Sequence, residues 1–166
     1  MTPEFSRSVP LARLPEEGRE ERLVASPAEC AALAHRFAIP AVNRLEAALL
    51  LRPEPGGSVA VSGRLSAEVV QECVVTLEPV TKAVEEAVSL RILGPEEEPS
   101  DDPDSPDEIL AEGDAADLGE AIAEQLSLAL DPYPRAPGAA LPGGEEGEPP
   151  PASGPFAALS ALRKPR

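Results

Sequence analysis

The chain has 166 residues, a formal net charge of −16 and a sequence pI of about 4.4. This charge excludes broad, non-specific binding to nucleic acid, DNA included, because such affinity comes from lysines and arginines that neutralise phosphates. The charge favours a basic protein partner or, more plainly, simple solubility.

The cysteine count and the hydropathy pattern indicate a cellular compartment. Two cysteines are too few for a disulfide scaffold or a self-contained zinc site, and they fit a reducing environment. No apolar run of the sequence reaches the length of a signal peptide or a membrane span. We therefore expect a cytoplasmic protein without a membrane partner.

Proline and glycine divide the chain into folded and unpacked parts. They concentrate at residues 94–106 and 132–155, which predicts segments that bury little area. We expect a single α+β domain over residues 1–135, with a disordered acidic loop at about 94–108. Residues 136–166 are expected to form a Pro/Gly/Glu-rich tail that ends in a short amphipathic segment.

The N-terminal part predicts a strand, a hinge and a helix. Residues 5–14 carry an apolar residue every few positions and predict an opening strand, and residues 16–22 indicate a charged hinge. Ser26 is typical of a helix N-cap, and Glu29 stands where a capping box needs it. We expect a helix over residues 27–37.

The middle of the chain predicts an antiparallel meander. Residues 42–52, 58–73 and 82–93 are three apolar-alternating segments joined by short loops. The sheet they form is expected to be small and antiparallel, curved toward a barrel or left open. In the second strand, the alternation places Gly63 and Leu65 on the buried face and Arg64 on the opposite face.

An acidic stretch and a second helix follow. Between Ile92 and Pro134 there are 14 Asp and Glu residues and no Lys or Arg. Asp114 or Asp117 is expected to cap a helix that ends at Pro132. One stripe of this helix should pack on the sheet: Leu118, Ile122, Gln125, Leu126 and Ala129.

Cys73 has three interpretations: a nucleophile, a metal ligand or a small buried residue at a strand end. A nucleophile needs a base, and the only histidine, His35, lies on the polar side of the predicted first helix. A metal ligand of the knuckle type needs a second cysteine nearby, and position 76 is Thr. The pattern favours the buried residue, and we expect no metal and no other cofactor.

Two further features have alternatives that the sequence leaves open. Tyr133, between two prolines, either folds back to cap the core or projects toward a partner. The carboxylates of Asp117, Glu120 and Glu124 are candidates for a metal-dependent hydrolase, but they lie mostly on one helix face without a second group. No phosphate-binding loop or hydrolase motif appears, so the sequence gives no positive case for an enzyme.

Three motifs follow one another in the second half of the chain: VSGRLSAEVVQECVVTLEPV, DLGEAIAEQLSLALDPYPRAPG and a terminal PFAALSALR. In this order they resemble the YceD family of large ribosomal RNA subunit accumulation proteins, in an alphaproteobacterial-like form, and the resemblance covers roughly residues 58–162. Several members resemble CxxCL where this chain has Cys73 to Leu77, and some carry further cysteines after the helix. This chain has only Cys73 there, so a family metal site, if one exists, should be absent.

The resemblance implies a role in accumulation of large-subunit (23S) ribosomal RNA and so in assembly of the large subunit. Our leading hypothesis is a non-catalytic ribosome biogenesis factor that binds a basic large-subunit ribosomal protein or an early pre-ribosomal particle, and so reaches the RNA indirectly. The acids of residues 96–120 would steer this partner. The residues expected to orient it are Glu78, Pro79, Asp131, Tyr133 and Arg135.

The alternative hypothesis is direct binding of ribosomal RNA by a local arginine patch. Arginines that contact phosphates would give a steep salt dependence. The predicted sheet has no exposed aromatic side chains on which bases could stack, which counts against a single-strand platform. The patch would consist of Arg44, Arg52, Arg64 and Arg91, with Arg135 beside it.

Overall fold

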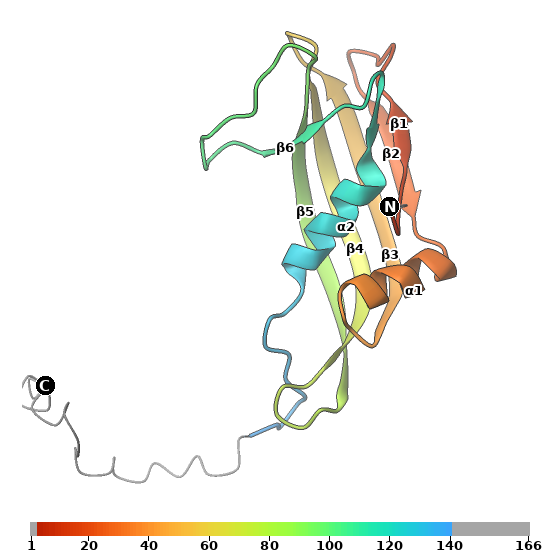
Figure 1. Ribbon diagram of the computed structural model, residues 1–166, viewed down its shortest axis with the longest axis vertical. Coiled ribbons are helices and arrows are strands. Elements are labelled where there is room, and N and C mark those ends of the chain that lie inside the picture. The colour runs from red at the N-terminus through yellow and green to blue at the C-terminus, as the bar shows by residue number, and fades with distance from the viewer. Residues whose placement is uncertain (1–2, 141–166) are drawn as a thin grey trace, which may run out of the picture.

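The computed structural model describes residues 3–140, in which there are two sheets and two helices (Figure 1). The elements are, in chain order, β1 Ser8–Pro10, β2 Arg19–Val24, α1 Pro27–Arg36, β3 Ala41–Pro53, β4 Val59–Glu72, β5 Pro79–Leu93, β6 Asp107–Leu110, β7 Ala115–Asp117 and α2 Leu118–Ala129. The predicted α+β class is confirmed. The predicted tail beyond residue 140, with its amphipathic segment, lies outside the described residues, and the division of domains at residue 135 stays a prediction.

The main sheet has five strands in the order β2-β3-β4-β5-β6. The predicted meander is confirmed as β3, β4 and β5, which are antiparallel neighbours. The sheet is mixed rather than purely antiparallel, because β6 pairs with β5 in parallel. It is open, with β2 and β6 at its edges, so the barrel alternative does not hold.

One prediction for a connecting segment is wrong, and the end of another moves to residue 106. The charged hinge at residues 16–22 is mostly strand β2, in which Leu23 is the one apolar side chain that faces the core. A pattern with one inward apolar residue is too weak to predict a strand, and β2 forms because β3 offers it a long edge. The acidic loop ends at residue 106, since β6 begins at Asp107, and residues 95–106 form no helix or strand.

The opening strand is shorter than predicted. Only β1 forms within residues 5–14, and it pairs with β7 in a separate two-stranded sheet. This pairing places the N-terminal segment beside the start of α2, where the Leu118 N–H donates to the Arg7 carbonyl over 3.0 Å.

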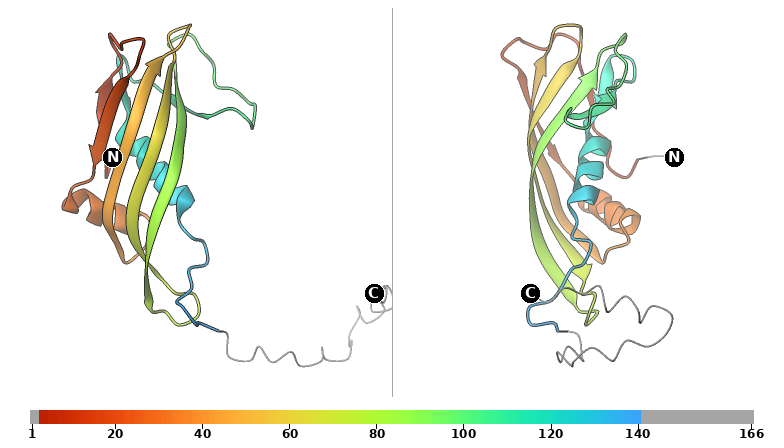
Figure 2. Two further views of the ribbon diagram at one scale, coloured as in Figure 1. Left: turned by 180° about the vertical axis from the view of Figure 1, so that it is seen from behind. Right: turned by 90° about the vertical axis from the view of Figure 1, so that its left-hand side faces the viewer.

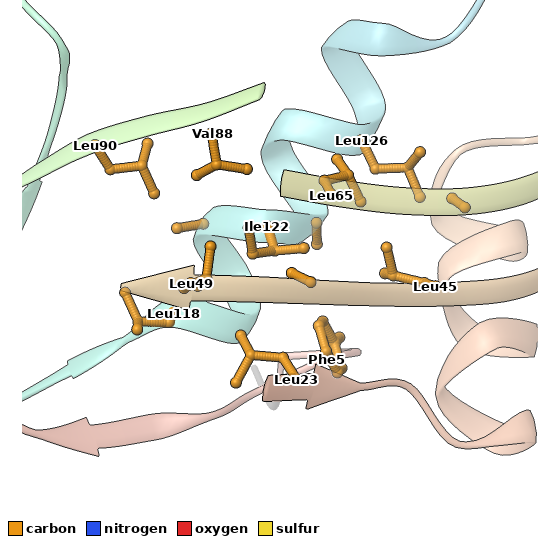
Figure 3. Close-up of a cluster of buried hydrophobic side chains, with 14 of the residues drawn as sticks. Phe5, Leu23, Leu45, Leu49, Leu65, Val88, Leu90, Leu118, Ile122 and Leu126 are labelled. Carbon is orange, nitrogen blue, oxygen red and sulfur yellow. The ribbon is translucent and has the colours of Figure 1, made fainter. Parts of the chain in front are cut away.

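Both helices lie on the same face of the main sheet and leave the other face bare (Figure 2). The core lies between the sheet and the helices, where Ile122 and Leu126 of α2 meet Leu65 and Val88 of the sheet (Figure 3). The predicted buried stripe of α2 is confirmed at Leu118, Ile122 and Leu126, whereas Gln125 is partly exposed and donates to Asp107 over 2.7 Å.

The caps of the two helices explain where each begins. The Ser26 hydroxyl accepts a hydrogen bond from the Glu29 N–H, and the Glu29 carboxylate accepts one from the Ser26 N–H over 2.7 Å, which confirms the predicted capping box of α1. Of the two candidates for the cap of α2, the structure selects Asp117. Its carboxylate accepts hydrogen bonds from the N–H groups of Gly119 and Glu120 over 3.0 and 3.2 Å.

Glu29 also joins the N-terminal segment to α1. Its two carboxylate oxygens accept hydrogen bonds from the two terminal nitrogens of Arg7 over 2.6 and 2.9 Å. This paired contact with the guanidinium is the main reason that the pKa of Glu29 falls to about 2. The contact therefore stabilises the fold when Glu29 is ionised.

The Glu29→Gln substitution should reduce the pH dependence of stability in acid. The pKa of Glu29 in the folded protein lies below the ordinary value of 4.5. Its contribution to the free energy of unfolding is therefore complete above pH 4.5 and is lost as the pH falls toward 2. We expect the substitution to lower the free energy of unfolding by about 1–2 kcal/mol at pH 7. The loss of stability between pH 4.5 and pH 2 should be smaller in the variant than in the unsubstituted protein. Urea unfolding from pH 7 to pH 2.5 measures this. Glu16→Gln, at an exposed loop position, is the control, and an equal decline in both variants would contradict the assignment.

Candidate partner-binding site

The predicted partner-binding residues meet at one end of the molecule, which we call the hairpin end. It consists of the turn between β4 and β5 (residues 73–79) and the segment after α2 (residues 131–136), which lie side by side in both views (Figures 1 and 2). The Val74 N–H donates to the Pro134 carbonyl over 2.9 Å, and Gln71 Nε2 donates to the Asp131 carbonyl over 2.9 Å. All five predicted residues belong to this end: Glu78, Pro79, Asp131, Tyr133 and Arg135.

Asp131 and Lys82 attach the segment after α2 to β5. The Lys82 ammonium forms an ion pair with the Asp131 carboxylate, and the Tyr133 N–H donates to the same carboxylate over 2.9 Å. The bond from Lys82 and then that from Tyr133 lower the pKa of Asp131. Asp131 is therefore a structural residue of the hairpin end, and its carboxylate is already occupied.

Cys73 fills the interior of the hairpin end. Its side chain is fully buried directly after β4, and its sulfur accepts hydrogen bonds from the N–H groups of Ala136 and Thr76 over 3.2 and 3.4 Å. The bond from Ala136, followed by those from Thr76, lowers the pKa of Cys73 to about 7. The predicted buried residue at a strand end is confirmed. His35 is exposed on α1, and within residues 3–140 no hydrogen bond joins it to Cys73.

The hairpin end exposes three apolar side chains to solvent. Val74, Leu77 and Tyr133 are 48%, 71% and 72% exposed. The interpretation that Tyr133 folds back onto the core is therefore wrong, because the hydrogen bonds of its neighbours turn the ring outward. Leu77 has a positive φ of 61°, an uncommon conformation for a branched side chain. Tyrosine is enriched at the centre of protein–protein interfaces, and Val74 and Leu77 extend the apolar surface beside Tyr133.

Of the predicted steering acids of residues 96–120, those up to Asp104 lie at the opposite end of the molecule, on the loop of residues 95–106 that projects from the sheet (Figure 1). The others follow in β6, β7, the turn between them and the start of α2. Among the loop acids, Glu97 is an exception, because it accepts hydrogen bonds from the Arg91 guanidinium over 3.0 Å and from the Gly94 N–H over 3.1 Å. Glu108 also has a local partner, the Ser100 N–H at 2.6 Å. The acids of this loop that are exposed are Glu96, Glu98, Asp101, Asp102 and Asp104.

The four arginines of the alternative RNA site all lie on the bare face of the sheet. The strand register places Arg44 opposite Glu68 on this face, and Arg52 and Arg91 on either side of Ala60. Arg64 lies between Ala48 and Ala87 in the same way. The sequence alternation predicted this shared face correctly for Arg64.

Acidic neighbours compensate part of this arginine charge. Arg44 pairs with Glu46 at 2.5 Å, and Arg91 pairs with Glu54 at 2.9 Å and with Glu97 at 3.0 Å. Arg52 donates to the Glu17 carbonyl over 3.3 Å, whereas Arg64 and Arg135 form no ion pair within residues 3–140. A phosphate would have to compete with these carboxylates, which weakens the case for an RNA platform.

The candidate carboxylates of the hydrolase hypothesis have structural partners. Burial alone would raise the pKa of Asp117, but hydrogen bonds from Ser6 and from three backbone N–H groups outweigh it and lower the pKa. Glu120 pairs with Arg36 at 2.7 Å, and Glu124 is exposed. In the described part of the chain, no three His, Cys, Asp or Glu side chains form a group able to hold a metal ion. No described helix is long and apolar enough to cross a membrane.

The fold and the surface define an acidic α+β protein whose exposed features are a hairpin end, a projecting acidic loop and a bare sheet face. The chain belongs to the YceD family, because the family model "Large ribosomal RNA subunit accumulation protein YceD" matches residues 61–163. The family name ties the chain to accumulation of the large ribosomal RNA subunit. Among curated proteins and solved structures, no significant match was found.

The family match covers β4 to α2 and extends beyond the described residues. The hairpin end, the acidic loop and β5 therefore belong to the matched part, whereas β1 to β3 and α1 precede it. Sequence reasoning missed Leu77 and Val74 as exposed residues of the hairpin end. The signal that would have found them is the pair of apolar residues in a turn, where burial is not available.

Proposed function

We propose that the chain is a non-catalytic binding factor that supports accumulation of 23S ribosomal RNA by holding a basic protein of the large subunit, or an early particle that contains one. The distribution of charge is the observation that supports this proposal. Fourteen acids and no lysine or arginine lie between Leu93 and Tyr133, on the segment that runs from the projecting loop through β6, β7 and α2 to Asp131. A surface with this charge attracts a basic protein and repels free RNA.

The geometry supports different roles for the two ends of the molecule, with the acidic loop attracting the partner and the hairpin end holding it. The acidic loop raises the rate of encounter with a basic partner that is long enough to extend from the loop to the hairpin end, since charges on a projecting segment act over only about one Debye length, roughly 8–10 Å. The hairpin end provides the apolar contacts of Tyr133, Leu77 and Val74, which hold the partner after the encounter. Arg135 and Glu78 border this apolar group and orient the partner.

Neutralising the exposed acids of the loop should slow association with the basic partner. The variant replaces Glu96, Glu98, Asp101, Asp102 and Asp104 with Gln or Asn and keeps Glu97, which pairs with Arg91. We expect an association rate about tenfold lower at 50 mM salt, and a difference that disappears at about 500 mM salt. Surface plasmon resonance measures both rates. A variant with Gln at positions 16, 17, 20, 68 and 72 removes the same charge outside the loop, and an equal effect of both variants would contradict steering by the loop.

Direct RNA binding is the second candidate function, and the shared face of Arg44, Arg52, Arg64 and Arg91 favours it. RNA that contacts these arginines would be released steeply as salt rises. Affinity for a large-subunit RNA fragment is the measurement, with Arg64→Ala as the variant. If that affinity stays flat between about 50 and 200 mM salt, RNA is not held by phosphate contacts.

A further inference from the structure

The outer edge of β5 is without a strand partner over most of its length. β5 spans Pro79–Leu93, and β6 pairs only with its last four residues, Leu90 to Leu93. On the side away from β4, no strand of residues 3–140 pairs with residues 79–89. Alternate N–H and C=O groups of this stretch therefore face outward without a backbone partner in the described part of the chain.

The helix layer extends over this free edge. α2 crosses the sheet, and its C-terminal half reaches the outer side of β5 (Figures 1 and 2). Leu128 of α2 is 79% exposed there. A groove of about 280 Å³ lies between β5, β6 and α2 at the end of the free stretch, where β6 begins to pair with β5 at Leu90. Its lining consists of Leu90, Asp107, Glu108, Ile109, Ala121, Glu124, Gln125 and Leu128.

The side chains of the free edge are consistent with a missing neighbour. Glu85, Glu86 and Ala87 are all exposed, although Glu86 lies on the helix-covered face between Val84 and Val88. In a strand with neighbours on both sides, a residue on the covered face is normally buried. The groove and the edge thus combine unpaired backbone groups, an exposed leucine and carboxylates of Glu85, Glu86 and Glu124.

We propose that the free edge of β5 binds an extended, basic segment of the partner protein as an additional strand. Strand addition supplies the missing backbone hydrogen bonds, and alternate side chains of the added strand contact the two faces. Lysines or arginines of the segment meet Glu85 on the bare face and Glu86 or Glu124 on the helix face. An apolar residue enters the groove against Leu128. The basic character of the occupant rests on the proposed function as well as on these acids.

A second copy of this chain fits the edge less well. Two-fold pairing of one β5 edge with another would bring Glu85 and Glu86 of both copies close together, and like charges in paired strands are destabilising. The basic segment is therefore the occupant that the charge of this edge favours.

Hydrogen exchange on the full chain tests strand addition. The probe is an eight-residue peptide in which lysine and valine alternate, and the control is the same peptide with every backbone nitrogen methylated, which keeps the charge but cannot donate. We expect amides of residues 79–89 to exchange at least about tenfold more slowly with the probe and to be unchanged with the control. Protection by both peptides, protection confined to other residues, or protection in the absence of peptide through self-association would overturn the proposal.

Two variants separate this proposal from the proposed function. Leu128→Ser should weaken binding of the probe peptide about tenfold. The double variant Glu85→Gln/Glu86→Gln should weaken it about threefold to tenfold. Glu16→Gln/Glu17→Gln, which removes the same charge from an exposed loop, should leave it unchanged. If the native basic partner is retained in full by both edge variants, the edge proposal fails and the function stands. If no basic partner exists but the probe still protects β5, the function fails and the edge stands.

Discussion

Replacing Gly63 with valine is expected to abolish the native sheet. Gly63 lies in β4 opposite Leu49 of β3, and a Cβ atom added there would stand 2.0 Å from the Ala48 carbonyl oxygen and 2.9 Å from the Leu49 Cα. Both neighbours are backbone atoms, so no flexible side chain can yield. The two strands would have to separate in the middle of the sheet.

We expect Gly63→Val to lower the free energy of unfolding by about 4 kcal/mol or more, which is an exceptionally large loss for one substitution. Urea unfolding followed by circular dichroism measures the loss, and failure to fold at 25 °C is within the expected outcome. Ser62→Val, at the exposed neighbouring position on the same strand, is the control and should change stability by less than about 1 kcal/mol. A Gly63→Val protein that unfolds at the same urea concentration as this control would show that the strands do not approach as described.

Truncation of Ile122 should produce the second largest loss. Its side chain is fully buried between α2 and the sheet, where it meets Leu65 and Val88 (Figure 3). Ile122→Ala removes three carbon atoms and leaves a cavity that the surrounding strands fill only in part. We expect a loss of about 2–5 kcal/mol in the free energy of unfolding.

Leu128→Ala is the matched control for Ile122→Ala, because Leu128 belongs to the same helix but is 79% exposed. It should change the free energy of unfolding by no more than about 0.5 kcal/mol. Similar losses for the two variants, measured by urea unfolding, would mean that α2 does not pack on the sheet through the Ile122 side.

The sequence predicted the elements that carry their own periodicity. The alternation in β4 placed Leu65 on the buried face, whereas Gly63, predicted to share that face, is exposed. The capping box at Ser26 and Glu29 defined the start of α1. These features depend on neighbours within a few residues, so a local pattern contains them.

Elements that depend on distant partners were not predictable in the same way. β2 has one apolar side chain toward the core, Leu23, and β6 has four residues, so neither has a pattern of its own. Both exist because a longer strand offers them an edge. The exposure of Tyr133 depends likewise on hydrogen bonds between the segment after α2 and the turn at Cys73.

The candidate site likewise has some features that the local sequence predicts and others that depend on the folded chain. The sequence indicated Glu78, Pro79 and the residues 131–135, and the structure places them at one end of the molecule. The pairing of Arg91 with Glu54 and Glu97 could not be read from the sequence, because Glu54 lies on a different loop. Burial and ion pairing decide which charged groups are free to bind, and both are properties of the folded chain.

The most direct test of the account is purification of the native protein from its own cells at low salt, with half of the eluate treated with ribonuclease. Mass spectrometry then identifies the proteins that remain bound in each half. The account predicts that a basic large-subunit protein remains bound after nuclease treatment and dissociates as salt rises. Loss of every partner with the RNA would contradict it and would make the arginines of the bare face, Arg64 first, the residues to substitute.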